Sequence, residues 1–230
     1  MTNPLACATC PARDRAACAA LSDEQRDELG RLGQRRTLQR GETLLASGDE
    51  RPLSATLISG ALKISNFDAD GTERILSLVH PAGFIGEMFA PIAHHDVVAL
   101  TTSQLCVFTQ ADYAAAVDRF PALAKALLRR TADDLLASRA TIDLISRHNA
   151  QQRVASFLLG MARAASDSPC HPASEFELPL TRGEIAGFLG LTIETVSRQL
   201  TALESEGAIR RAGQRSIHVS ELGRLEAAAA

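Results

Sequence analysis

The sequence predicts an α+β chain that begins with a β-roll, continues through one long helix and ends with two short helices and a β wing. Three observations support this order. Between residues 36 and 110, glycines interrupt short apolar runs, as in a small all-β unit. From residue 113 to about 146, glycine disappears and apolar residues follow a helical period. After residue 180, two helix-capping patterns precede a weak strand pattern.

At 230 residues, the chain is long enough for one large domain or two small ones. Its 46% apolar and 22% charged residues indicate a packed globular protein. The patterns divide it into a cysteine-rich N-terminal segment (1–20), the β-roll (21–112), the long helix (113–146) and a C-terminal domain (147–230).

The clearest strand pattern in the β-roll covers residues 56–79. TLISGALKISNF is predicted to form a strand, DADG a tight turn, and TERILSLV a second strand. Asp-Gly is a strong hairpin signal because the tight turn needs residues that accept a positive φ. Several short strands at this spacing predict a small β-roll or barrel.

The predicted long helix carries a narrow apolar stripe. Its residues recur at seven- and three-residue steps: Leu128, Leu135, Ile142 and Ile145. Thr131 and Ser138 occupy the intervening positions. A stripe this narrow favours packing against a second copy of the same helix, which predicts a homodimer interface. Packing of the stripe on the β-roll of the same chain is the alternative.

The strongest local pattern is LTRGEIAGFLGLTIETVSRQLTALESEG, residues 180–207. Thr181 and Glu184 form the Thr-x-x-Glu pattern of a capping box, which starts a helix. Gly190 suits the left-handed residue that ends this helix, and Thr192 can cap the next one. Because a two-stranded pattern (IRRAGQRSIHVS) follows, the segment predicts a winged helix-turn-helix.

The second helix of this pair has two different faces. Val196, Leu200 and Leu203 are spaced i, i+4 and i+7 and therefore face the core. The opposite face, near the N-terminal end of the helix, holds four residues: Ile193, Glu194, Ser197 and Arg198. These are the positions that a recognition helix inserts into the major groove of DNA.

The side chains on this face match the edges of DNA bases. Arginine donates twice to guanine, glutamate accepts from the cytosine amino group, serine can do either, and isoleucine can contact a thymine methyl group. A surface ion pair between Glu194 and Arg198 is the alternative. The two caps and the wing arginines Arg210, Arg211 and Arg215 favour DNA binding.

The helix-turn-helix segment resembles the DNA-binding signature of the CRP/FNR superfamily of transcription regulators, and E-x-x-S-R within IETVSRQL resembles its FNR branch. The resemblance covers nearly the whole chain. It implies a cyclic-nucleotide-binding-like jelly roll, a long dimerisation helix and a winged helix-turn-helix. It also implies that Glu194, Ser197 and Arg198 read double-stranded promoter DNA with palindromic TTGAT-like half-sites, and that RNA polymerase is a partner. Ile193 lies where the CRP branch carries an additional arginine.

Cys7, Cys10 and Cys18 form a C-x2-C-x7-C pattern, and Cys106 lies far away at the end of a predicted strand. Thiolates are the ligands of iron–sulfur clusters, and four of them complete a cubane site. The arrangement resembles the oxygen sensors of the FNR group. The seven-residue gap departs from that of the enteric FNR proteins but is similar to the FnrN/FnrL relatives. We therefore expect a 4Fe–4S cluster that clamps the N-terminal segment to the β-roll.

The resemblance also implies how the cluster acts. The intact 4Fe–4S form orders the N-terminal region and favours the dimer, whereas oxygen converts or destroys the cluster, the dimer loosens and DNA affinity falls. Two half-sites one helical turn apart, about 34 Å, are bridged only by a dimer. Loss of the dimer therefore removes the gain from bivalent binding.

Other interpretations of the cysteines stay open. Zinc also binds four thiolates at such spacings. Cys106, between Leu105 and Val107, also fits a small buried hydrophobic residue. Cys170 lies in the loop SDSPCHPAS and belongs to no pattern, so we expect no role for it.

Two other sensors are disfavoured. The Gly86-Glu87 pair resembles the ribose-binding end of a cyclic-nucleotide pocket, but Asp96 and Val97 stand where the phosphate requires a cation. Haem binding at His94 and His95 is disfavoured because histidines on a polar loop are more often solvated than bound to a metal.

The remaining patterns exclude several classes of protein. No G-x-S-x-G, H-E-x-x-H or phosphate-binding glycine loop occurs, so we expect no enzyme. No run of eighteen apolar residues predicts a membrane span, and the N-terminus lacks a signal-peptide pattern. The expected location is the cytoplasm, where thiols stay reduced. A net charge of −3 argues against a non-specific polyanion binder.

Overall fold

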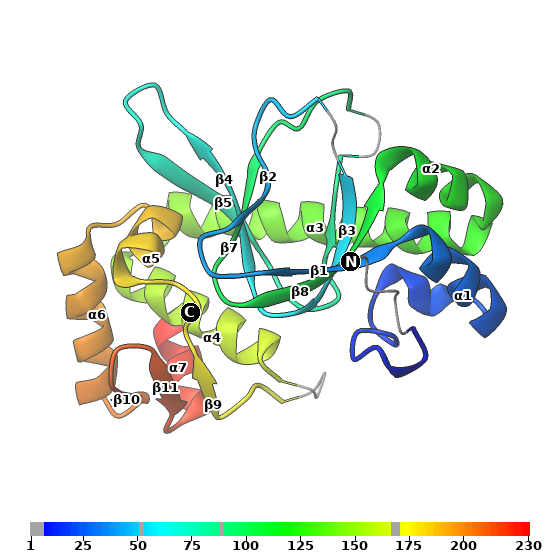
Figure 1. Cartoon of the computed structure of the whole chain (residues 1–230). Helices are drawn as coiled ribbons and strands as arrows, with labels where there is room; N and C mark the ends of the chain where they lie inside the picture. Colours follow the sequence, from blue (N-terminus) through cyan, green and yellow to red (C-terminus); the bar gives the residue numbers. More distant parts are fainter. Residues whose placement is uncertain (1–6, 51–52, 88–89, 167–170) are drawn as a thin grey trace. The chain divides into compact units, whose positions relative to one another are not determined.

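The structure, a computed structural model, describes residues 7–50, 53–87, 90–166 and 171–230 (Figure 1). The chain divides into two compact units, Met1–Ala137 and Ser138–Ala230. Cys170, to which the sequence gives no role, and residues 1–6 lie outside the described residues. In the described part of the chain, no helix combines the length and the apolar character needed to span a membrane.

The first unit begins with short helices that pack beside the β-roll. Two 3-10 turns, η1 (Cys7–Thr9) and η2 (Ala17–Ala20), precede helix α1 (Asp23–Leu32). The Ser22 hydroxyl accepts a hydrogen bond from the Gln25 backbone N–H, and the Gln25 side chain accepts one from the Ser22 N–H, which makes a capping box. Helix α1 lies within the range 21–112 predicted as the β-roll domain and was not foreseen, because two leucines in ten residues form no helical apolar stripe.

The β-roll consists of two four-stranded sheets in the described residues, ordered β1-β8-β3-β6 and β2-β7-β4-β5, with antiparallel neighbours. This confirms the predicted α+β fold with an N-terminal jelly roll. The strands are β1 (Gln34–Leu38), β2 (Thr43–Leu45), β3 (Leu53–Ser59), β4 (Leu62–Phe67), β5 (Glu73–Val79), β6 (Phe84–Ile85), β7 (Asp96–Ala99) and β8 (Ser103–Thr109).

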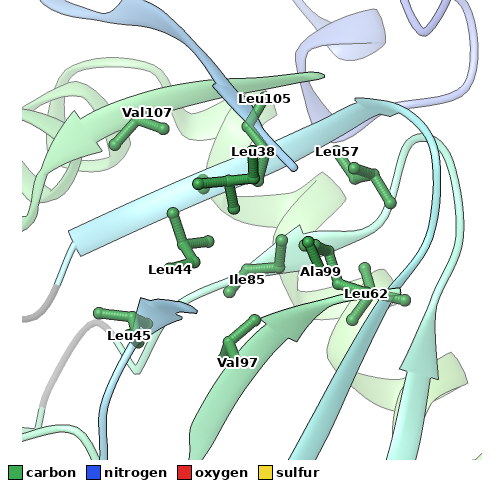
Figure 2. Packing of buried hydrophobic residues seen from close by; sticks show 12 residues of the cluster. Leu38, Leu44, Leu45, Leu57, Leu62, Ile85, Val97, Ala99, Leu105 and Val107 are labelled. Carbon is green, nitrogen blue, oxygen red and sulfur yellow. The ribbon is translucent and has the colours of Figure 1, made fainter. Parts of the chain in front are cut away.

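The core of the β-roll lies between the inner faces of these sheets. Figure 2 shows its aliphatic side chains pointing toward one another from strands of both sheets. Leu57, Leu62 and Leu105 are fully buried there. Burial of one such side chain contributes about 1.5–3 kcal/mol relative to exposure. Because successive residues of a strand point to opposite faces of the sheet, the strand neighbours of each core residue face away from the core.

The strand expected over residues 56–67 is interrupted at Gly60, so that part of the prediction was wrong. Gly60 has φ +95° and separates β3 from β4. A Cβ at this position would collide with Ser103 Oγ and lie 2.7 Å from the Thr102 carbonyl oxygen. Only glycine accepts both the positive φ and this close approach. The DADG turn is confirmed: it joins β4 to β5, with Gly71 at φ +81°.

The helix expected over residues 113–146 is two helices, α2 (Gln110–Arg119) and α3 (Pro121–Arg147), so the single-helix prediction needs correction. Between them, Phe120 has φ −117° and ψ 89°, outside the helical region. The ring of Pro121 disfavours the helical backbone at the residue before it. Proline is tolerated at the first position of α3 because the N–H groups there have no intrahelical acceptor.

The fully buried residues of helix α3 lie near its N-terminal end. Leu123 and Leu127 are buried in a cluster that includes Tyr113 of α2 and Leu29 of α1. Every residue from 131 to 140 is exposed. The middle of the helix is therefore exposed in the described chain.

The predicted apolar stripe falls largely on this uncovered part. Leu128 is 71% exposed and Leu135 50%, so the alternative of packing on the chain's own β-roll does not hold for these two residues. Ile142, in the second unit, is 65% exposed. Leu136, which lies outside the predicted stripe, is also 61% exposed. Ile145 is half-buried, and its Cγ2 lies 3.7 Å from where a Cβ of Gly190 would be.

The second unit is the predicted winged helix-turn-helix. Its helices are α4 (Ala150–Ala164), α5 (Arg182–Leu189), α6 (Ile193–Ser205) and α7 (Leu222–Ala229), and its strands are β9 (Glu175–Glu177), β10 (Ile209–Ala212) and β11 (Ser216–Val219). The wing has three strands in the described residues, ordered β10-β11-β9, where two were predicted. Strand β9 is three residues long and buries only Phe176. A strand this short shows no alternation of buried and exposed residues that the sequence could reveal.

Candidate metal centre and nucleic-acid interface

Four cysteines from distant parts of the chain line one cavity of about 40 Å³. Cys7 lies in η1, Cys18 in η2, Cys10 between these two turns, and Cys106 in β8. Much of the remaining lining is apolar, including Leu29, Ile58, Phe108 and Tyr113. We call this space the cysteine cavity. The structure thus brings together all four cysteines that the sequence singled out.

Strand alternation places Cys106 in this cavity. Its neighbours Leu105 and Val107 are buried in the core between the two sheets, so Cys106 points to the opposite face of β8. There it packs beside the cluster that contains Phe108 and Tyr113. Cys106 is therefore not part of the core between the sheets, and its interpretation as a small buried hydrophobic residue stays open, because it packs against this second apolar cluster.

Two arginines hold the N-terminal segment against the cavity. Arg26, which is only 7% exposed, donates from Nε to the Cys18 carbonyl oxygen at 3.2 Å and from Nη2 to the Leu21 carbonyl oxygen at 3.0 Å. Arg13 donates to the Ala8 carbonyl oxygen at 3.2 Å and to the Asp23 carboxylate at 2.6 Å. Both arginines line the cysteine cavity, and no cysteine-spacing pattern indicates them.

The four thiols influence one another electrostatically. Burial raises the pKa of Cys7 and Cys18 above the ordinary value and raises the pKa of Cys106 to about 12. The Cys10 thiolate adds to each of these increases. A cation bound among the thiols would offset both the burial and the mutual repulsion, which is why metal binding releases thiol protons.

The donor set consists of four thiols, which are the ligands of iron–sulfur clusters. In the described ranges, no group of three or more His, Cys, Asp or Glu side chains is arranged to hold a metal ion. In a 4Fe–4S cluster each thiolate binds a different iron atom, so the four sulfurs need not converge on one point. Four thiols around one partly apolar cavity meet that requirement.

The predicted helix caps of the DNA-binding unit are confirmed. The Thr181 hydroxyl accepts a hydrogen bond from the Glu184 backbone N–H, and the Glu184 carboxylate accepts one from the Thr181 N–H at 2.7 Å. Gly190 ends α5 in the left-handed conformation, with φ 63° and ψ 41°. The Thr192 hydroxyl then caps α6 by accepting from the Thr195 N–H.

These caps orient the proposed recognition face of α6. Val196, Leu200 and Leu203 are buried, as predicted from their spacing. The four predicted DNA contacts lie elsewhere on the helix, with Ser197 half-buried and the other three exposed: Ile193, Glu194 and Arg198. Among the residues that the structure describes, neither charged side chain of this face forms an ion pair, so the alternative of a surface ion pair is not realised.

Of the three wing arginines, Arg211 is bound within the protein rather than available to DNA. Arg211 donates from Nε to the Glu204 carboxylate at 2.8 Å, and its backbone N–H donates to the same carboxylate at 2.9 Å. These hydrogen bonds lower the pKa of Glu204. Arg211 therefore fastens the wing to α6, whereas Arg210 remains exposed and Arg215 is half-buried.

A second cavity, of about 400 Å³, is bounded by β-roll strands and α3. Its charged lining includes Glu87 and Asp134, and the described residues that line it include no lysine or arginine. A cyclic nucleotide phosphate would meet the Glu87 and Asp134 carboxylates there; Asp96, on which the expectation from the sequence was based, is not among the lining residues. His94 and His95 both direct Nδ1 to the Glu87 carboxylate.

Two family models match the chain. A Crp-like helix-turn-helix domain matches residues 152–228, and a cyclic nucleotide-binding domain matches residues 35–120. Their bounds agree with the winged helix-turn-helix and the β-roll.

Similar proteins extend over nearly the whole chain. The transcriptional activator protein FnrL of Cereibacter sphaeroides is 33% identical over 222 residues, which cover 95% of this chain and 90% of that protein. A probable transcriptional activator of Rhizobium leguminosarum is 35% identical, over 97% of this chain and 93% of its own length. The structure of FixK2 from Bradyrhizobium japonicum matches with a TM-score of 0.78 at 25% identity, over 86% of this chain and 98% of that one.

We predict that Gly190→Ala lowers the free energy of unfolding by about 1 kcal/mol, because alanine is strained at a positive φ. The nearest side-chain atoms are 3.7 and 3.8 Å from the new Cβ, so the cost comes from the backbone. Gly160→Ala is the matched control: no atom lies within 4 Å, and the mid-helix position should gain about 0.5–1 kcal/mol. Urea unfolding followed by circular dichroism measures both. Equal stabilities of the two variants would contradict the left-handed cap.

Proposed function

The chain belongs to the CRP/FNR family of transcription regulators, and we propose that it is a homodimeric, oxygen-responsive member of it. In this proposal it binds an FNR-like palindromic promoter while a 4Fe–4S cluster is intact, and cluster oxidation ends dimerisation and DNA binding. The observation that carries the proposal is the cysteine cavity, where the N-terminal segment and β8 together supply four thiols. RNA polymerase as a partner and the cytoplasm as the location are expected from the family alone.

The residues that would hold the cluster are Cys7, Cys10, Cys18 and Cys106. When bound, a 4Fe–4S cluster supplies an oxygen-sensitive covalent link between the N-terminal segment and the β-roll. The chain's own residues prepare this link. Arg26 fixes the backbone within η2 and directly after it, and apolar side chains line much of the space around the thiols.

The N-terminal segment also packs against the base of the dimerisation helix. Ala17 and Leu21 share one apolar cluster with Leu123 and Leu127 of α3. Ordering the N-terminal segment therefore supports the first turns of α3, and releasing it would remove part of their packing. Such a contiguous set of packed side chains is a physical route from the cysteines to the dimer.

The second copy of the chain is the occupant that we propose for the exposed face of α3. Leu128, Leu135 and Ile142 are each at least half exposed and recur every seven residues, which suits a two-helix seam. Leu136 extends this face. Soluble proteins rarely leave such a continuous apolar strip uncovered, and a symmetric partner covers it with the same residues.

A dimer would present two copies of α6 to two half-sites about 34 Å apart. On each copy, Glu194, Ser197 and Arg198 would contact base edges and Ile193 a thymine methyl group. The charged groups of this face have no ion-pair partner in the described residues and are available to DNA.

The cluster is tested first by composition. Purified without oxygen, the wild-type protein is expected to be brown, with about four iron and four sulfide per chain. Cys106→Ala should lose most of both, whereas Cys170→Ala should retain them. On admission of air, the absorption should bleach while DNA affinity falls. A colourless protein, or one that holds zinc, would contradict the oxygen-sensing proposal and leave the DNA-binding assignment intact.

Arg198→Ala is expected to weaken specific DNA binding by about 1–3 kcal/mol, because a bidentate contact to guanine is lost. The anaerobic dimer is titrated with TTGAT-type palindromic DNA and with a scrambled duplex. Arg163→Ala, which removes an exposed arginine at the end of α4, serves as the control and should change little. Full affinity and discrimination in Arg198→Ala would refute the assignment of the recognition face.

Leu135→Glu is expected to make the anaerobic protein mostly monomeric, because two carboxylates would be buried opposite each other at the seam. Sedimentation velocity measures the assembly, and a DNA titration should show the corresponding loss of affinity. Ala137→Glu introduces the same charge about half a turn away on the 3.6-residue helix and should leave the dimer unchanged. A dimer of normal stability in Leu135→Glu would rule out this face as the interface.

A further inference from the structure

Three arginines line the cysteine cavity, and their hydrogen-bond donors are used differently. Arg13 and Arg26 donate to backbone carbonyl oxygens and to Asp23. These two side chains therefore hold the N-terminal segment in place. The third, Arg35, reaches the cavity from the opposite wall, on β1.

Sheet register places Arg35 beside one of the four cysteines. In the antiparallel pairing of β1 with β8, Arg35 is the direct partner of Cys106, and on the other side of β8 the partner of Cys106 is Thr56. Directly opposed residues of an antiparallel pair point to the same face and have Cβ atoms about 4.5–5.5 Å apart. All three side chains line the cysteine cavity.

The Nε–H group of Arg35 is buried and has no hydrogen-bond partner among the described residues. Buried donors are almost always paired, and an unpaired donor on a charged group is especially unfavourable. The next residue, Arg36, lies on the opposite face of β1 and is exposed, whereas the Nε–H of Arg35 is buried. Its placement therefore indicates an acceptor that the protein chain alone does not provide.

Charge identifies the kind of acceptor. Arg35 lines the cavity together with Cys7 of the N-terminal segment and Cys106 of β8, so its guanidinium lies among thiols from both walls of the cavity. A cluster held by four thiolates presents anionic sulfur to its surroundings. Hydrogen bonds to sulfur and nearby charge are among the factors that set the reduction potential of such clusters.

We propose that Arg35 is a positioning residue for the iron–sulfur cluster, its buried Nε–H donating to cluster or thiolate sulfur and its positive charge stabilising the reduced state. This inference rests on the proposed function, because it requires a cluster in the cysteine cavity. It adds a specific residue, outside the cysteine pattern, that sets how firmly the cluster is held and at what potential it is reduced.

The test compares four proteins reconstituted without oxygen with ferrous iron and sulfide: wild type, Arg35→Gln, Arg35→Lys and Arg36→Gln. Iron and sulfide content is measured first. The one-electron midpoint potential is then measured by titration with dithionite in the presence of redox dyes. Transfer of iron to a ferrous chelator gives the rate of cluster loss, and thermal unfolding of the apo chains reports stability without the cluster.

Arg35→Gln is expected to lower the equilibrium constant for reduction about tenfold, or about 59 mV for one electron, and to speed iron loss several-fold. Arg35→Lys retains the charge and should recover most of the potential. Arg36→Gln, on the opposite strand face, should match the wild type. Apo Arg35→Gln should be at least as stable as the apo wild type, because an unpaired buried donor has been removed.

Each result separates the two proposals. If the wild type assembles an iron–sulfur cluster but Arg35→Gln matches Arg36→Gln in potential and iron loss, this inference is overturned and the proposed function stands. A less stable apo Arg35→Gln with an unchanged potential would show a purely structural role and would also overturn it. If the wild type assembles no cluster, the proposed function fails, and this inference fails with it.

Discussion

Successive side chains of β8 point alternately into the core of the β-roll and into the cysteine cavity, so the register of this one strand sets both. Leu105 and Val107 are buried between the sheets, and Cys106 points to the other face. A slip of one residue would move both core side chains out of the core, which makes the register strongly specified. β8 lies between β1 and β3, so it cannot shift without breaking both ladders. The packing that stabilises the roll therefore also fixes where the fourth thiol stands.

A second apolar cluster, on the outer face of β8, joins the N-terminal segment to the start of α3. Ala17 of this segment packs there with Leu29 of α1 and with Tyr113, Leu123 and Leu127. Beyond this cluster, residues 131–140 of α3 are exposed in the described chain, including Leu135 and Leu136, whereas Ile145 near its end is half-buried. One helix is thus unevenly covered: its base packs in this apolar cluster, and its middle is exposed. In the proposed function a second copy covers the exposed part, and release of the N-terminal segment would loosen the base.

The fold of the DNA-binding unit follows from local sequence signals that do not involve the cysteines or the β-roll. Thr181 and Thr192 start the two helices of the turn, Gly190 ends the first, and three apolar side chains of α6 anchor the second. The exposed face of α6 follows from that anchoring. Membership of the CRP/FNR family therefore rests on the roll and the helix-turn-helix together, whereas the signal that is sensed rests on the cysteines and on the groups around them.

The sequence alone determined the features whose causes lie within a few residues: the capping boxes, the left-handed Gly190, the DADG turn and the spacing of three cysteines. The break between α2 and α3 at Phe120 also has a local cause, because Pro121 follows it. Contacts between segments that are distant in the sequence could be identified only from the tertiary structure. Helix α1, with few apolar residues, the three-residue β9 and the Arg211–Glu204 pairing gave no periodic signal. The approach of Cys106 to the N-terminal thiols, and of Arg35 to Cys106, is decided by the sheet register. That register is set by burial of the whole core rather than by the residues that it brings together.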